Sequence, residues 1–262
     1  MTRLLEELSS LEQLSLIDIS YSRLNTMFDK DWGCDAKYFY AYVAKEPKQF
    51  GAAATLGNVI HKALEENLDP NEPVDLESLL VSYEEQLPLW DPDGAINQDL
   101  RAAGYEMLTE FVDRHASDKF PIIAKEYPFA IVVGRGLISG YIDRVDRVGD
   151  RIIITDYKSG KKEVAAKNIP SDLQLGIYAL AADTMFPGHE IYAQLYYLRT
   201  GRQKGHTFSK YDLESVESKL LELISRIISK RDFHPTANER ICNWCDFNNG
   251  VCPVGTARAA KH

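Results

Sequence analysis

The sequence lacks the features that mark secreted and membrane-spanning proteins. Its four cysteines among 262 residues are too few for a disulfide scaffold. No apolar run approaches the roughly 18 residues that a membrane span needs. Residues 1–15 mix glutamates with leucines and have no basic start followed by an apolar stretch, so they are not a secretory signal. We therefore expect a globular, cytoplasmic protein that has no membrane partner.

Basic residues are nearly absent from residues 51–100, where a single lysine accompanies eleven Asp and Glu. The net charge of the chain is −9, which argues against a protein that coats nucleic acid non-specifically. The charge is unevenly distributed, however, because Arg199, Arg202, Lys204 and Lys210 lie within twelve residues without an acid. This basic stretch can meet a polyanion, although a solvated face is as good an interpretation of each charge.

The hydrophobic pattern predicts helices over most of the first 120 residues. Leucines recur at helical spacing over residues 4–11, and Thr55 is a candidate N-cap for a helix that continues to Leu68. Residues 75–87 and 97–115 are also predicted to be helical, and prolines punctuate the chain between the helices.

From residue 121 the pattern changes to that of strands. Residues 122–133, 136–148 and 151–157 form three runs that glycine-containing turns separate, which predicts a three-stranded meander.

The chain then returns to a helix. Ser171 and Gln174 have the spacing of a capping box at the start of an apolar helix. Residues 191–198 form a further strand, and residues 213–229 have the period of a long amphipathic helix. This order of elements predicts an α/β fold with a mixed sheet.

Two carboxylates and a lysine cluster where the predicted meander ends. Asp156 and Lys158 follow the apolar triplet Ile152–Ile154, and strand alternation puts them on one face with Tyr157 on the other. Asp143 lies in the neighbouring strand of a tight hairpin and can reach the same place. Two carboxylates with room for water suit Mg²⁺ or Mn²⁺. For an Asp and a Lys alone, an exposed charge pair at a strand end is the alternative.

Four motifs occur in a fixed order along residues 54–200. They are Gly57-Asn58-Val59-Ile60-His61 in a helix, Gly140-Tyr141-Ile142-Asp143-Arg144 and Asp156-Tyr157-Lys158 in strands, and Gln174-Leu175-Gly176-Ile177-Tyr178 in a helix. Together they resemble the PD-(D/E)xK nuclease superfamily, specifically its RecB-like branch. The resemblance implies a restriction-endonuclease-like fold, in which helices flank a mixed central sheet.

The resemblance also implies a metal site. Its ligands are His61, Asp143, Asp156 and the carbonyl oxygen of Tyr157, and Lys158 is the catalytic lysine. A metal so held supplies Lewis acidity and lowers the pKa of bound water. The lysine then orients or deprotonates that water, or neutralises the developing charge, and the sequence does not decide between these roles.

Other polar residues carry weaker signals. By the resemblance, Gln174 and Tyr178 support the site or touch DNA, although the capping box explains Gln174 when it is taken alone. His61 alone is more often an ordinary helical histidine. Glu126, in the first strand of the meander, is a candidate additional carboxylate, but a surface glutamate is the favoured interpretation.

Basic residues near these motifs predict a path for the substrate. Arg202 and Lys204 are expected to contact DNA beyond the last strand of the sheet, together with Arg199. Around the active strand, the candidates are Arg144, Lys161, Lys162 and Lys167. Each phosphate contact releases counterions, so these residues would bind DNA without regard to its sequence.

The cysteines provide a second match. Cys242, Cys245 and Cys252 lie close together, but three thiolates lack the fourth ligand of a zinc or cubane iron–sulfur site. Cys34 can supply it only if the two ends of the chain meet. This split arrangement resembles the iron–sulfur clasp of Cas4-like and AddB-type nucleases, which implies a [4Fe–4S] cluster, with zinc as the alternative. The sequence departs from these relatives because Asp35, rather than proline, follows the first cysteine.

We predict a single nuclease domain over residues 1–262. It has a core at about 54–200, a helical insertion at 70–120, and a clasp formed by residues 16–45 and 230–262. No P-loop motif is present, so any helicase or recombination partner is a separate protein.

The leading hypothesis is a Mg²⁺- or Mn²⁺-dependent DNA nuclease. It is expected to be an exonuclease on single strands or strand ends in recombination, repair, phage DNA metabolism or CRISPR adaptation. One alternative is a catalytically silent DNA-binding or assembly subunit of a helicase–nuclease complex. A third hypothesis is a zinc module on an unrelated α/β enzyme.

Overall fold

The computed structural model describes residues 16–47, 51–236, 239–243, 245–248 and 250–254. The chain divides into two compact units. Unit 1 comprises Met1–Pro47, Phe129–Gly140 and Glu217–His262, and unit 2 comprises Lys48–Pro128 and Tyr141–Val216. The single nuclease domain stays a prediction.

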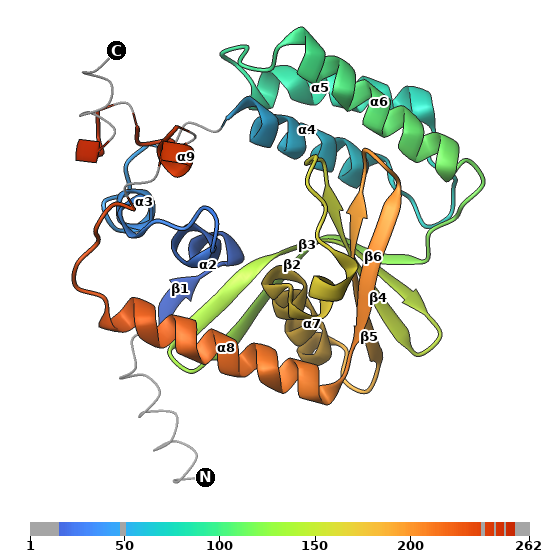
Figure 1. The fold of residues 1–262 in the computed structure, drawn as a ribbon. Coiled ribbons are helices and arrows are strands. Elements are labelled where there is room, and N and C mark those ends of the chain that lie inside the picture. Colours follow the sequence, from blue (N-terminus) through green and yellow to red (C-terminus); the bar gives the residue numbers. More distant parts are fainter. Residues whose placement is uncertain (1–15, 48–50, 237–238, 244, 249, 255–262) are drawn as a thin grey trace. The chain divides into compact units, whose positions relative to one another are not determined.

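A mixed sheet runs through the described part of the chain (Figure 1). Its strands are β1 (Ile17–Ile19), β2 (Ile122–Val133), β3 (Gly136–Val148), β4 (Arg151–Lys158), β5 (Glu190–Tyr197) and β6 (Arg202–Phe208). The strand order is β1-β3-β4-β5-β6, and β2 pairs with β3. β1 with β3 and β4 with β5 are parallel, whereas β3 with β4 and β5 with β6 are antiparallel. The predicted α/β fold with a mixed sheet and a three-stranded meander is therefore confirmed.

Helices flank the sheet. They are α2 (Tyr21–Phe28), α3 (Asp35–Tyr38), α4 (Ala52–Asn67), α5 (Leu76–Trp90), α6 (Gln98–Arg114), α7 (Leu173–Met185), α8 (Lys210–Ser229) and α9 (Glu239–Cys242). Two short helical turns, Phe39–Val43 and Ala166–Ser171, precede α4 and α7. No described helix is long and apolar enough to cross a membrane. The helix predicted over residues 4–11 lies outside the described residues.

The starts of two helices differ from the predictions. α4 begins at Ala52, so Thr55 lies inside it and bonds back to the carbonyl of Gly51 instead of capping the helix. The N-cap of α7 is Asp172, whose carboxylate accepts from the Leu175 N–H at 3.0 Å. Ser171 ends the preceding turn, where its hydroxyl donates to a carbonyl, so the predicted capping box is wrong. The aspartate already satisfies the free N–H of the first turn, because a carboxylate is a strong N-cap acceptor.

Two strands were not predicted. β1 has three residues, which is too short for a periodic signal. β6 reads Arg-Gln-Lys-Gly-His-Thr-Phe and pairs only with β5, so backbone hydrogen bonds rather than an apolar face define it. Arg202 and Lys204 therefore lie in the last strand of the sheet and not beyond it.

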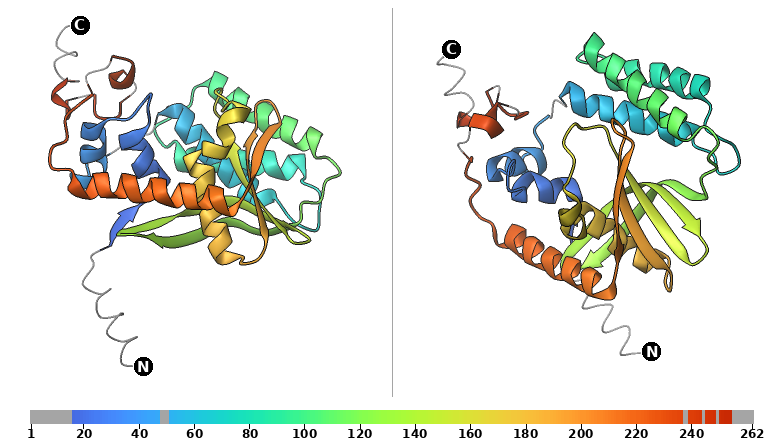
Figure 2. Two further views of the ribbon diagram at one scale, coloured as in Figure 1. Left: turned by 60° about the horizontal axis from the view of Figure 1, so that its bottom comes forward. Right: turned by 45° about the vertical axis from the view of Figure 1, so that its right-hand side comes forward.

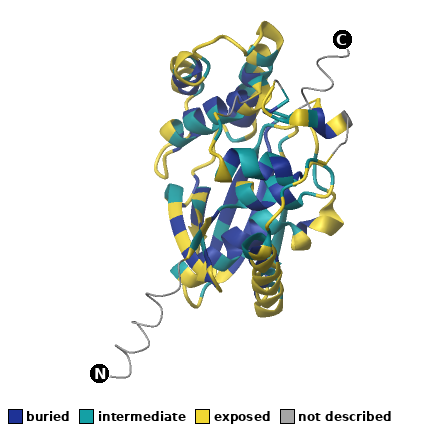
Figure 3. Cartoon of the chain, turned by 90° about the vertical axis from the view of Figure 1, so that its left-hand side faces the viewer, coloured by how far each residue is buried: buried dark blue, intermediate teal, exposed yellow. Residues whose placement is uncertain are grey.

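An apolar core in unit 2 holds α4, α5 and α6 together against β4 and β5 (Figure 2). Phe111 of α6 lies 6.0 Å from the ring of Tyr157 and 5.5 Å from that of Tyr196. Buried residues follow the strands, and exposed residues lie on the outer faces of the helices (Figure 3). The aromatic contacts join α6 to the end of β4, which carries part of the candidate site.

Candidate active site

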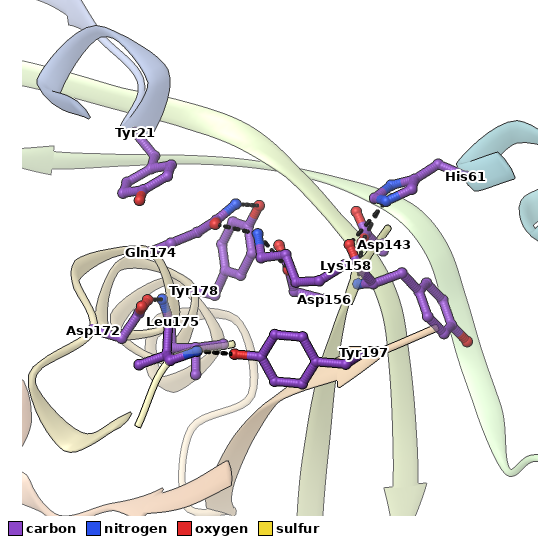
Figure 4. A network of polar contacts seen from close by, with 12 residues as sticks. Tyr21, His61, Asp143, Asp156, Lys158, Asp172, Gln174, Leu175, Tyr178 and Tyr197 are labelled. Atoms are coloured by element: carbon purple, nitrogen blue, oxygen red, sulfur yellow. Dashed lines mark hydrogen bonds and ion pairs between the residues drawn. The ribbon is translucent and has the colours of Figure 1, made fainter. Parts of the chain in front are cut away.

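Polar side chains from four elements of unit 2 converge at the end of β4 (Figure 4). α4 provides His61 and β3 provides Asp143, while β4 provides Asp156 and Lys158 and α7 provides Gln174 and Tyr178. A Cβ at Gly57 would lie 3.1 Å from Ser159 Oγ, so the glycine of the helical motif lets α4 lie close to the chain after Lys158.

The predicted ligands His61, Asp143 and Tyr157 lie together. His61 Nε2 is 2.9 Å from the carbonyl oxygen of Tyr157, and Nδ1 is 3.4 Å from Asp143 Oδ2. The backbone N–H of Tyr157 donates to the same Asp143 oxygen at 2.7 Å. Burial lowers the pKa of His61, but the Asp143 carboxylate outweighs burial and raises it to about 9. Burial acts to raise the pKa of Asp143, but His61 and the Tyr157 N–H hold it below its usual value.

Asp156 and Lys158 form the second part of the site. Asp156 is buried, and its Oδ2 lies 2.7 Å from Lys158 Nζ. Burial raises the pKa of Asp156 to about 6, although the lysine opposes the shift. The Tyr157 ring points the other way, into the aromatic core, which confirms the alternation predicted for this strand.

Gln174 and Tyr178 extend the site onto α7. The ammonium of Lys158 donates to Gln174 Oε1 at 2.7 Å, and Gln174 Nε2 donates to the Tyr178 hydroxyl at 3.0 Å. The Gln174 side chain thus supports the lysine, whereas the capping box would have turned it toward its own backbone. Burial raises the pKa of Tyr178 well above its usual value, so its hydroxyl stays protonated.

Glu126 was interpreted as a surface glutamate, and this interpretation is wrong. It is partly buried, and one of its oxygens, one His61 nitrogen and one Asp143 oxygen lie within 4.8 Å of one another. Burial and then the Asp143 charge raise the pKa of Glu126 to about 7. Its φ of 42° is in the left-handed region, which a non-glycine residue rarely adopts and which often marks a functional site.

The backbone at Glu126 explains why strand periodicity failed there. Buried and exposed residues alternate in the second half of β2, but residues 124–127 are all half-buried. Pro128 follows directly, and proline inside a strand favours an edge or a bulge. This proline is the signal in the sequence that could have identified the irregular backbone.

Arg144 does not lie where DNA could reach it, so the expectation that it contacts DNA is wrong. Only 5% of its surface is exposed. Its guanidinium donates to the Tyr157 hydroxyl at 2.6 Å, pairs with Asp146 at 3.1 Å and lies 4.3 Å from the centre of the Phe120 ring. Strand alternation turns Arg144 to the face opposite Asp143, and the core covers that face.

The predicted DNA contacts on β6 have partners within unit 2. Lys204 Nζ lies 2.8 Å from the Glu163 carboxylate and donates to the carbonyl of Val164, also at 2.8 Å. Arg202 lies 3.6 Å from Glu163 and is otherwise exposed. The two residues tie the segment after Lys158 to the edge strand. Their contact with DNA stays a prediction.

Unit 1 brings the distant cysteines into one region. The N–H of Thr236 donates to the sulfur of Cys34 at 3.3 Å, and the sulfur of Cys242 lies 3.9 Å from the Thr236 carbonyl oxygen. Burial raises the pKa of Cys245, and Cys34 adds to the shift. Burial also raises the pKa of Tyr40, and Cys252 and Cys34 contribute. Thr236 therefore contacts both Cys34 and Cys242.

Contacts around α3 join the two ends of unit 1. Lys230 forms an ion pair with Asp35, and Lys37 lies 3.5 Å from Asp246. The Tyr38 ring stacks on Phe233 with a centroid distance of 6.1 Å. Asp35, which replaces the proline of the relatives, is thus the first residue of α3 and binds the segment that leads to the C-terminal cysteines.

Comparisons with known proteins agree with this fold. The model of the PD-(D/E)XK nuclease superfamily matches residues 18–253. This chain belongs to that superfamily, and it is a nuclease by family. Nucleases of this class use divalent metal ions, and His61, Glu126 and Asp143 form a group that could hold one.

One solved structure shows a similar fold. The chain is similar to a protein from Eubacterium rectale described as a candidate exonuclease, with a TM-score of 0.55 and 11% identity over 86% of this chain and 87% of that chain. It also matches a structure named SSO0001, with a TM-score of 0.43 and 15% identity over 97% and 96% of the two chains. No curated protein sequence matches the chain.

Proposed function

We propose that this nuclease hydrolyses phosphodiester bonds in DNA with Mg²⁺ or Mn²⁺, and that it acts as an exonuclease on single strands or strand ends. The observation that carries the proposal is the convergence of His61, Asp143 and the Tyr157 carbonyl beside the buried pair of Asp156 and Lys158. The name given to the Eubacterium rectale protein also supports exonuclease activity.

The residues fit a hard divalent cation. Carboxylate and carbonyl oxygens with one imidazole are the donors that Mg²⁺ and Mn²⁺ accept in proteins. Among the described residues, Asp156 Oδ2 accepts no well-aligned hydrogen bond despite its closeness to Lys158. Glu126, Asp143 and Asp156 are half-buried or buried, and the Asp143 charge adds to burial in raising the pKa of the other two, so a cation would relieve their mutual repulsion. His61, Asp143, Asp156 and the Tyr157 carbonyl would hold the metal, and Glu126 is an additional carboxylate.

The chain's own residues orient the reaction. When bound, the metal supplies Lewis acidity and lowers the pKa of a coordinated water. Lys158 is a compact donor beside the carboxylates and is aimed by Gln174. From there it can orient or deprotonate the attacking water, or neutralise the charge that develops on the phosphate. Tyr178 fixes the orientation of the Gln174 amide.

We further propose that Cys34, Cys242, Cys245 and Cys252 bind a [4Fe–4S] cluster in unit 1. Four cysteines without another ligand type suit this cluster, and zinc is the alternative. The contacts of Thr236 with Cys34 and Cys242 support a common site. Such a site would close a loop of some two hundred residues and so act mainly on folding. Iron and sulfide analysis after anaerobic purification distinguishes the two metals.

The assay for the main proposal uses DNA labelled at the 5′ or 3′ end. Single-stranded and double-stranded substrates are incubated with Mg²⁺, Mn²⁺ or EDTA. We expect metal-dependent release of short products from strand ends, and no cleavage in EDTA. Binding without cleavage in every metal would favour the silent DNA-binding subunit instead. The intact set of Asp143, Asp156 and Lys158 argues against that alternative. A helicase partner and a role in recombination, repair, phage DNA metabolism or CRISPR adaptation stay predictions.

A further inference from the structure

The outer face of α5 in unit 2 carries a groove that the nuclease site does not use. It has a volume of about 740 Å³, and its floor is formed by Leu76, Leu80 and Val81 of α5 with Tyr105 of α6. α5 lies beside α6 in Figures 1 and 2, and the residues that line the groove run along α5. The nuclease motifs do not explain it, because none of its residues belongs to them.

The polar groups beside the floor already have partners. The Tyr105 hydroxyl bonds to Glu84, and Glu84 also pairs with Arg101. The floor is therefore an apolar surface that can bind an apolar side chain. Val81 is 52% exposed even though α5 packs on the core through its other face. Covering such a surface removes apolar area from water, which is worth about 25 cal/mol per Å².

The rim of the groove is acidic. Glu77 and Glu85 lie one turn before and after Val81 on the same helix, and both are exposed. Beyond this ridge a second hollow of about 450 Å³ is lined by the same two glutamates and by Glu66. Residues 68–100 contain nine Asp and Glu and no Lys, Arg or His. Such a surface repels the phosphate backbone of DNA and attracts basic groups.

We propose that this groove binds a basic amphipathic helix from a protein partner. The apolar side chains of that helix, at positions i, i+4 and i+7, enter the groove, and its Lys and Arg side chains reach Glu77 and Glu85. A helix fits better than an extended peptide because the groove is lined by α5 and Tyr105 of α6, and none of its lining residues belongs to a strand edge to which a β-strand could be added. The proposal is independent of the proposed DNA nuclease function.

A peptide selection tests the proposal. A random library of peptides of about 16 residues, roughly four helical turns, is displayed on phage and selected on the immobilised full-length protein. We expect the enriched peptides to be basic and to carry apolar residues at helical spacing. Their affinity should fall at least about tenfold in the double variant Glu77→Lys/Glu85→Lys and in Val81→Asp. The matched control Glu214→Lys/Glu217→Lys, which makes the same charge change on α8, should leave the affinity unchanged.

Other results would overturn the proposal. They include enrichment of no peptide, enrichment of acidic or non-periodic peptides, and an affinity that the two α5 variants leave unchanged. Competition by a single-stranded oligonucleotide would assign the groove to the substrate instead. Circular dichroism establishes that each variant folds, and Val81→Ser replaces Val81→Asp if the latter does not. Cleavage of DNA by the Glu77→Lys/Glu85→Lys variant should match that of the native protein.

Discussion

The ammonium of Lys158 donates a hydrogen bond to Oε1 of Gln174 at 2.7 Å and thereby links the end of β4 to the first turn of α7. Gln174 has one acceptor oxygen and one donor nitrogen, and it uses the nitrogen to bond the Tyr178 hydroxyl. If the amide turned over, it would lose the bond from Lys158, because an amide NH₂ cannot accept a hydrogen bond from an ammonium. The lysine lies between this amide, which belongs to α7, and the Asp156 carboxylate, which belongs to β4. These two groups set its position.

The first prediction concerns the chemical step. Lys158→Ala and Asp156→Ala should each abolish cleavage, a loss of more than about 10³-fold in turnover, because both residues act on the metal and the transition state. DNA binding and the fold should be largely retained, as gel-shift and circular dichroism measurements will show. Lys219→Ala, which removes an exposed ammonium from α8, is the matched control. Near-normal turnover by either site variant would remove Lys158 and Asp156 from the mechanism.

The second prediction tests whether Gln174 positions Lys158 for the reaction. Gln174→Leu keeps the volume of the side chain but removes the acceptor for Lys158. We expect turnover to fall by about 10- to 100-fold with little change in KM, the usual cost of losing an outer hydrogen bond to a catalytic group. Tyr178→Phe should have a smaller effect because Gln174 keeps its bond to the lysine. Equal turnover in the Gln174→Leu variant and the native protein would show that the amide does not position Lys158.

The third prediction concerns pH and the stability of the metal-free protein. The raised pKa values of Asp156 and Glu126, about 6 and about 7, mean that the folded state holds more protons than the unfolded state above pH 4. Their contribution to stability is therefore lost as the pH rises through 6 and 7. His61, with a pKa of about 9, contributes stability below pH 6.5 that is lost as the pH rises toward 9. The melting temperature should thus fall between pH 5 and pH 9.

Variants and metal provide the controls for this pH dependence. Glu126→Gln removes the half-buried carboxylate charge, so it should flatten the fall and raise the melting temperature at pH 8. Mn²⁺ should stabilise the native protein more at pH 8 than at pH 6, because its ligands must be deprotonated. Isothermal titration calorimetry at both pH values measures the same effect as an affinity. A melting temperature that rises with pH in EDTA would contradict the assigned proton binding.

The fourth prediction tests whether Arg144 is a buried structural residue and not a DNA contact. Tyr157→Phe removes one hydrogen-bond partner of the guanidinium and should destabilise the protein by about 1–3 kcal/mol. Arg144→Ala leaves Asp146 without its buried partner and should cost about 3–5 kcal/mol. Urea unfolding measures both values. The salt dependence of DNA binding should stay unchanged in Tyr157→Phe and in Arg144→Ala, if the latter folds. A phosphate contact would instead reduce the slope by about one unit.

The fifth prediction concerns the cysteines. Cys34→Ala should lose the proposed cluster and lower the melting temperature, although Cys34 is far in sequence from the other three cysteines. Asp35→Pro is the matched control, because proline is tolerated at the first position of a helix. It should keep the iron and lose only the ion pair with Lys230. A full complement of iron and an unchanged melting temperature in Cys34→Ala would exclude Cys34 as a ligand.

Much of the fold was predictable because local patterns determine it. The apolar runs of β2, β3 and β4 and the glycine-containing turns between them were sufficient to predict the meander. The same alternation placed Asp156 and Lys158 on one face and Tyr157 on the other. β6 could not be predicted, since its polar residues carry no periodic signal and its position depends on hydrogen bonds to β5.

The sequence by itself determined which residue types are available at the site, because the order and spacing of the motifs are local properties. Only the tertiary structure decided their partners. In the structure, Gln174 bonds to Lys158 and not to its own backbone. An irregular strand places Glu126 beside His61, and Arg144 is buried against Tyr157. These outcomes depend on contacts between elements far apart in the chain. The free energy of each polar group at the site depends on its burial and its partners, and a local sequence pattern does not contain that information.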